Sequence, residues 1–170
     1  MASLAFVTAC GAGSTEPANT ATQATANDVE INGKTPCAAV KAQQGKLPVK
    51  GKIEAVEPSE GAPQSACAVT PDEWEPGRSL VVTFAKQQAA DWLKSQGIAE
   101  PSQKKTTAYT VLSGKLPNQN LSCHSGIDTP SGKSVNVQLS SMAGQGVASK
   151  DLCGEAANIA EALANETGKQ

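Results

Sequence analysis

The chain has 170 residues and a formal net charge of −2, and aromatic residues make up only 3% of it. Its Lys and Arg residues form no cluster of the kind that neutralises phosphates, so we expect no nucleic-acid partner. No apolar run approaches the ~18 residues that a membrane-spanning helix requires, so we expect no transmembrane segment.

Residues 7–10 read Val-Thr-Ala-Cys and resemble a bacterial lipobox, in which an aliphatic residue stands three places before a cysteine and a small residue directly before it. This motif predicts a lipid on Cys10 and makes residues 1–9 a truncated or partial signal peptide. A complete signal begins with positive charge, whereas the first basic residue here is Lys34. A translation start placed too far downstream, or a shortened chain, would explain the difference. The alternative interpretation is an ordinary N-terminus with an unmodified Cys10.

Residues 10–28 are mostly Thr, Ala, Asn, Gly and Ser, with almost no large apolar side chain. Such a segment cannot bury enough surface to offset its ordering entropy, so we predict a flexible, disordered tether behind the lipidated cysteine. Acyl chains contribute ~0.8 kcal/mol per buried methylene, so two or three of them would anchor the protein firmly. We therefore expect a lipid-anchored, extracytoplasmic protein on the outer face of the cytoplasmic membrane.

Residues 29–170 are predicted to form a single α+β globular domain. Alternation of apolar and polar residues and β-branched runs predict strands, and apolar residues at helical spacing with capping residues predict helices. The predicted strands are 29–33, 67–69, 79–84, 106–112, 121–127 and 134–139, and the predicted helices are 36–44, 85–96 and a C-terminal helix that contains 152–163. Residues 46–63 fit either a strand or a loop. We expect an antiparallel sheet of about four or five strands with helices packed on one face.

Four cysteines remain in the predicted domain: Cys37, Cys67, Cys123 and Cys153. They contain no C-x-x-C pair and the chain has one His, so we expect neither a metal nor a cofactor. An even set of cysteines is typical of disulfides in an oxidising compartment. Three pairings are possible, and we favour Cys37–Cys67 with Cys123–Cys153 over the two crossed alternatives. Each bridge would contribute roughly 3–4 kcal/mol in the chain-entropy description.

Two short motifs accompany the lipobox and the tether. Residues 35–40 read TPCAAV and residues 151–163 read DLCGEAANIAEAL, with a strand cysteine between them. Together these features resemble actinobacterial (mycobacterial and corynebacterial) cell-envelope lipoproteins that carry a domain of unknown function. The resemblance spans roughly residues 31–165. It implies attachment to the envelope and a small disulfide-stapled domain, and it implies no activity.

His124 is the one imidazole that a catalytic site could use, and Ser125 and Asp128 follow it closely. A Ser-His-Asp triad needs side chains that converge from separate elements, whereas neighbours along one strand point to opposite faces. We therefore predict no catalytic residue and place His124 at the surface of a hairpin. Trp74, in an acidic and Pro-flanked loop, is either a lid over the core or an exposed contact for a partner.

The leading hypothesis is a non-enzymatic, membrane-anchored binding or accessory subunit for another cell-envelope protein or membrane complex. The alternative is a lipoprotein that presents a small molecule, lipid or glycan from a pocket between helix and sheet, and an envelope hydrolase ranks third. An exposed apolar patch around Trp74 or Trp92 would favour the protein partner, and a pocket of several hundred Å³ would favour the ligand. The sequence indicates no oligomeric state.

Overall fold

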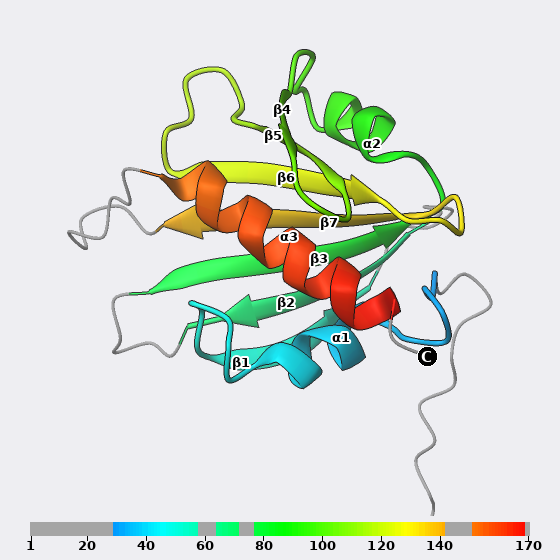
Figure 1. Ribbon diagram of the computed structural model, residues 1–170. Coiled ribbons are helices and arrows are strands. Elements are labelled where there is room, and N and C mark those ends of the chain that lie inside the picture. Colours follow the sequence, from blue (N-terminus) through cyan, green and yellow to red (C-terminus); the bar gives the residue numbers. More distant parts are fainter. Residues whose placement is uncertain (1–28, 58–63, 72–76, 142–150, 169–170) are drawn as a thin grey trace, which may run out of the picture.

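The computed structural model describes residues 29–57, 64–71, 77–141 and 151–168. Within these ranges it contains one seven-stranded antiparallel sheet and three helices (Figure 1). The strands are β1 (Lys52–Val56), β2 (Gln64–Thr70), β3 (Arg78–Ala85), β4 (Ser102–Lys105), β5 (Thr110–Gly114), β6 (Ser122–Asp128) and β7 (Ser134–Ser141), and the helices are α1 (Pro36–Gln43), α2 (Ala89–Ser95) and α3 (Leu152–Gly168). The expected signal peptide and tether, Cys10 and Trp74 lie outside the described residues.

The order of strands in the sheet is β1-β2-β3-β7-β6-β5-β4. Two antiparallel meanders, β1 to β3 and β4 to β7, meet where β3 pairs with β7 over eight residue pairs. The α+β class is confirmed, but the expected four or five strands were too few. The two edge strands account for the difference, since the sequence left the region of β1 open between strand and loop and gave no indication of β4. All four β4 residues and four of the five in β1 are exposed, so these strands lack the buried face that creates apolar alternation.

The expected strand over residues 106–112 is wrong in its first half, because the chain turns there. The backbone N–H of Thr106 donates to the carbonyl of Tyr109 over 2.8 Å, and the Thr106 hydroxyl accepts from the Tyr109 N–H over 3.1 Å. This Thr-centred turn joins β4 to β5, which pair from Lys105 and Thr110 onward. It leaves Tyr109 at the tip of the hairpin.

The expected strand over residues 29–33 is likewise a turn. Ile31 and Lys34 form an isolated bridge with two backbone hydrogen bonds of 3.1 Å. Between them, Asn32 and Gly33 have φ values of +52° and +74°. Two consecutive residues with positive φ match a type I′ turn, for which Asn-Gly is the favoured pair.

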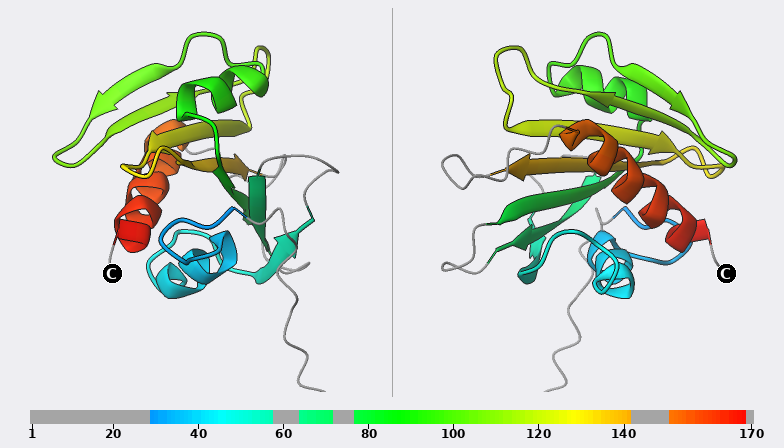
Figure 2. Two further views of the ribbon diagram at one scale, coloured as in Figure 1. Left: turned by 90° about the vertical axis from the view of Figure 1, so that its right-hand side faces the viewer. Right: turned by 60° about the vertical axis from the view of Figure 1, so that its left-hand side comes forward.

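The helices pack on both faces of the sheet, which corrects the expectation of one face. Cys123 in β6 is bonded to Cys153 in α3, whereas the next β6 side chain, His124, contacts Trp92 in α2. Because successive side chains of a strand point to opposite faces, α3 and α2 lie on opposite sides of β6, as Figure 2 shows. Helix α1 packs beside α3, on the same side of the sheet.

The main core lies between the sheet and the pair α1 and α3. The face of α3 that the sequence predicted is buried there, with Leu152, Ala156, Ile159, Ala160 and Leu163 at most 3% exposed. Both helices begin where their capping residues indicate. The Thr35 side chain accepts from the N–H of Ala38 over 3.3 Å in α1, and the Asp151 side chain accepts from that of Gly154 over 2.9 Å in α3.

Both favoured disulfides are present. Cys37–Cys67 joins the first turn of α1 to β2, with the Cα atoms 5.1 Å apart, and Cys123–Cys153 joins β6 to the first turn of α3, with the Cα atoms 5.2 Å apart. Cys67 and Cys123 are fully buried in the main core. The bridges therefore fasten α1 and α3 to the same face of the sheet.

Candidate functional site

His124 is buried, and the expectation that it lies at the surface is wrong. Its side chain is 2% exposed and packs against Trp92, with ring centroids 5.9 Å apart. Neither ring nitrogen has a hydrogen-bond partner among the described residues. Burial lowers the pKa of His124 from its usual value of 6.5, because desolvation disfavours the imidazolium. The imidazole is thus a neutral group at the interface between α2 and the sheet.

The two side chains that could complete a triad with His124 bond to other groups. The Ser125 hydroxyl lies on the α3 side, where it shares a 2.7 Å hydrogen bond with the Ser113 hydroxyl. The Asp128 carboxylate accepts a hydrogen bond of 2.6 Å from the N–H of Ala89 at the start of α2. The structure therefore brings none of these side chains together as nucleophile, base and acid.

The tryptophans do not provide an exposed anchor within the described residues. Trp92 is 4% exposed and belongs to a small second core between α2 and the sheet. The described large apolar side chains that are exposed are Val56, at the end of β1, and Leu121, in the loop before β6. A role for Trp74 in contacting a partner stays a prediction, since this residue lies outside the described ranges.

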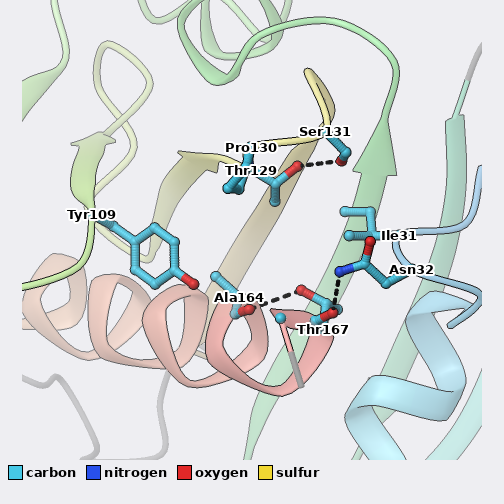
Figure 3. Close-up of a pocket in the computed structure, with 9 residues that line it drawn as sticks. Ile31, Asn32, Tyr109, Thr129, Pro130, Ser131, Ala164 and Thr167 are labelled. Atoms are coloured by element: carbon cyan, nitrogen blue, oxygen red, sulfur yellow. Dashed lines mark hydrogen bonds between the residues drawn. The ribbon is translucent and has the colours of Figure 1, made fainter. Parts of the chain in front are cut away.

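A cavity of about 280 Å³ opens where three distant segments meet (Figure 3). The Ile31–Asn32 turn forms one wall, the β6–β7 hairpin turn at residues 129–131 forms the second, and the last turn of α3 forms the third. Tyr109 reaches over from the β4–β5 hairpin, and its hydroxyl lies 3.7 Å from the position that a Cβ on Gly168 would occupy. Sequence reasoning missed this site because all four segments are short turns or helix ends.

Hydrogen bonds between these segments hold the cavity in shape. The Asn32 side-chain amide donates to the carbonyl of Thr167 over 2.8 Å, which ties the first turn to the end of α3. Within the hairpin turn, the Thr129 hydroxyl donates to the carbonyl of Lys133 and pairs with the Ser131 hydroxyl, each over 2.8 Å. The lining is therefore built before any ligand arrives.

A second hollow of about 390 Å³ adjoins the first. Both contain Tyr109, Thr129 and Pro130, and the second extends to Ala108 and Asp128. We call the two hollows together the Tyr109 groove. Among the described residues that line it, Asp128 is the one ionisable carboxylate and none is Lys or Arg.

A separate, more apolar hollow of about 290 Å³ lies beside α3, between Leu47, Pro48 and Ile159. Glu155, at its border, forms an ion pair with Arg78 that fixes α3 to the start of β3. The Tyr109 groove is the stronger candidate site, because it extends over two adjoining hollows and joins four segments that are distant in sequence.

Within the described parts of the chain, no three His, Cys, Asp or Glu side chains gather as metal ligands. None of the helices in those parts is both long and apolar enough to cross a membrane. Comparisons with protein-family models, with curated proteins and with solved structures found no match to this chain. The resemblance to actinobacterial lipoproteins therefore rests on its short motifs alone.

Proposed function

We propose that this chain is an extracytoplasmic, lipid-anchored, non-enzymatic binding protein or accessory subunit of the cell envelope, and that it presents a small ligand in the Tyr109 groove. The observation that carries the binding function is the groove itself. It is concave, it joins four segments that are distant in sequence, and hydrogen bonds fix its walls. Small-molecule sites have this combination of a preformed hollow and a few polar groups that set orientation.

Two observations support the location. Both disulfides bridge elements of the folded domain, and such bridges persist in oxidising compartments outside the cytoplasm. The lipobox-like residues 7–10 supply a cysteine for the anchor. Against an enzyme stands the geometry around the single histidine, because His124 faces α2 whereas Ser125 faces α3.

The binding function is tested by protein-observed NMR on the full chain with a fragment library of neutral, anionic and cationic small molecules. We expect fragments that shift the backbone signals of the Tyr109 groove. The variant Ser131→Trp, which fills the hollow from its rim, should abolish these shifts, and Lys115→Trp, at an exposed position outside the groove, should leave them unchanged. If no fragment of any class shifts the groove signals, the groove is not a binding site and the proposal fails.

The anchor is tested on the protein extracted from its membrane with a mild detergent. Mass spectrometry should find a diacylglyceryl group on Cys10, and the Cys10→Ala variant should be released from the membrane. An unmodified Cys10 with residues 1–9 still attached would refute the anchor. Recovery of a second protein in stoichiometric amount from the same extract would favour the accessory-subunit role over ligand presentation.

A further inference from the structure

We infer that the ligand of the Tyr109 groove is a neutral saccharide of one or two rings, stacked on the ring of Tyr109. The inference rests on the proposed binding function and adds the chemical class of the ligand. It follows from the hydrogen-bonding capacity of the lining, its charge, its single aromatic ring and its size.

The lining offers both hydrogen-bond acceptors and hydrogen-bond donors. A hydroxyl has one proton, and Thr129 donates its proton to the carbonyl of Lys133. Ser131 must therefore be the donor in its bond with Thr129, which leaves the lone pairs of the exposed Ser131 oxygen for a ligand. Asn32 donates one of its two amide N–H groups to the carbonyl of Thr167, so its amide oxygen can accept from a ligand and its second N–H can donate to one. Acceptors and donors side by side suit a ligand with several hydroxyl groups, each of which can both donate and accept.

The charge of the groove disfavours anions. The last turn of α3 borders the groove, and the C-terminal end of a helix carries partial negative charge. Asp128 also borders the second hollow, with its carboxylate bonded to the N–H of Ala89 at the start of α2. Because none of the described lining residues is basic, a phosphate or carboxylate would find no counter-charge there.

Tyr109 supplies the one flat apolar surface of the groove. Its ring is partly buried against the main core, which fixes its orientation. In Figure 3 the ring stands at one side of the cavity with its hydroxyl toward Ala164, opposite Ile31 and Asn32, and Thr129, Pro130 and Ser131 lie along the edge between them. A pyranose has an apolar C–H face and a rim of hydroxyls, so it can lie on the ring while its hydroxyls meet the acceptors.

A cation is the competing ligand class, since negative potential also attracts ammonium groups. Recognition of quaternary ammonium relies on a cage of several aromatic rings, whereas this groove has only Tyr109 among its described lining residues. The hollow volumes, about 280 and 390 Å³, lie near the lower end of the ~300–1,000 Å³ range for small-molecule sites. That size fits one or two sugar rings.

The experiment titrates the full chain with maltose, cellobiose, lactose and sucrose, and with choline and maltose 1-phosphate as charged probes, while backbone NMR signals are recorded. We expect at least one neutral disaccharide to shift the signals of residues 108–110 and 129–131, and to bind more tightly than maltose 1-phosphate and choline. Shifts caused by choline or by apolar fragments, without shifts caused by any neutral sugar, overturn the inference and leave the binding function standing. Absence of shifts with every class overturns both.

Single substitutions in the groove test which side chains contact the sugar. Tyr109→Ala should weaken sugar binding about tenfold, the upper end of what a lost aromatic contact costs, and Tyr109→Phe should keep most of the stacking. Ser131→Ala removes an acceptor at the surface and should weaken binding a few fold, about the effect of one neutral hydrogen bond. Thr107→Ala, in the same hairpin turn as Tyr109 but outside the lining, is the matched control and should bind like the parent protein.

Because Tyr109 also packs against the core, thermal unfolding of each variant is measured beside its affinity. If Tyr109→Ala lowers Tm strongly, its affinity is not interpreted, and the sugar affinities of Tyr109→Phe and Ser131→Ala are compared with that of the parent protein instead. Equal affinity of Ser131→Ala, Thr107→Ala and the parent protein for the best sugar would overturn the assignment of the acceptors to this groove.

Discussion

The indole of Trp92 in α2 lies against the imidazole of His124 in β6, with ring planes tilted by 47°. Each side chain is almost fully buried, at 4% and 2% exposure. Neither imidazole nitrogen has a hydrogen-bond partner among the described residues, so an imidazolium here would lose its hydration without compensation. The packing of α2 on the sheet therefore favours the neutral form of His124.

The stability of the protein should decrease as the solution becomes acidic. The pKa of His124 is near 6.5 in the unfolded chain and lower in the fold. Between these two pKa values His124 is protonated in the unfolded chain but not in the folded one. The free energy of unfolding therefore decreases as the pH decreases, by up to ~1.4 kcal/mol per pH unit. Above the unfolded pKa the contribution is constant. Urea unfolding at a series of pH values on both sides of 6.5 measures the effect.

The control is His124→Asn, which has no group that titrates in this range. Since the chain has one His, this variant should lose the slope just below neutral pH, while the acid unfolding caused by carboxylates at lower pH persists. An unchanged slope in His124→Asn would show that His124 is not its source.

The two disulfides allow a matched comparison, because both join cysteines 30 positions apart. Replacing either pair with alanines, as Cys37→Ala with Cys67→Ala or Cys123→Ala with Cys153→Ala, should lower the free energy of unfolding by roughly 3–4 kcal/mol in the chain-entropy description. Guanidinium unfolding of the two double variants measures both losses. A loss below about 1 kcal/mol for either pair would contradict a structural role for that bridge.

Asp128 supplies the cap that α2 lacks in its own sequence. The N-cap residue Gln88 makes no side-chain capping bond, whereas the Asp128 carboxylate accepts from the N–H of Ala89 over 2.6 Å. Asp128→Ala should destabilise the protein by about 1 kcal/mol, because it removes this acceptor and a negative charge from the N-terminus of α2. Asp128→Asn keeps an acceptor and should cost less. Equal unfolding midpoints for the parent and Asp128→Ala in urea would refute this role.

The parts of the fold that the sequence predicted well are those with one clearly apolar face. Helix α3 carries its buried residues at helical spacing, and Val135, Val137 and Leu139 of β7 alternate with polar residues and are fully buried. The cysteine pairing was favoured from the sequence but not decided by it, and the structure shows why it forms, since a single core layer brings together the strand of Cys123 and the helix of Cys153.

The sequence did not reveal the part of the fold in which a helix covers a polar face of the sheet. On the α2 side of the sheet, β6 and β7 present His124, Gly126, Ser134 and Asn136, and these residues are buried although none is large and apolar. Hydropathy gives no signal for such a face, so neither the position of α2 nor the burial of His124 was predicted. The Tyr109 groove was missed for a related reason, because turns place its residues together and carry no periodic pattern.

Gly126 tests the close approach of α2 to this polar face. A Cβ added at Gly126 would lie 2.9 Å from the Cβ of Ala89 and 2.7 Å from the side-chain oxygen of Asn136. Because the Ala89 methyl is attached directly to the helix backbone, α2 must shift outward to admit the new atom. Gly126→Ala should therefore destabilise the protein by about 1–3 kcal/mol, the usual cost of overpacking, and it should increase the solvent exposure of Trp92.

Gly45→Ala is the matched control, since an added Cβ there meets no atom within 4 Å, and it should change the stability by less than about 0.5 kcal/mol. Urea unfolding, with fluorescence quenching as a measure of tryptophan exposure, distinguishes the two variants. If Gly126→Ala is as stable as Gly45→Ala, then α2 does not pack against β6 as closely as the structure shows.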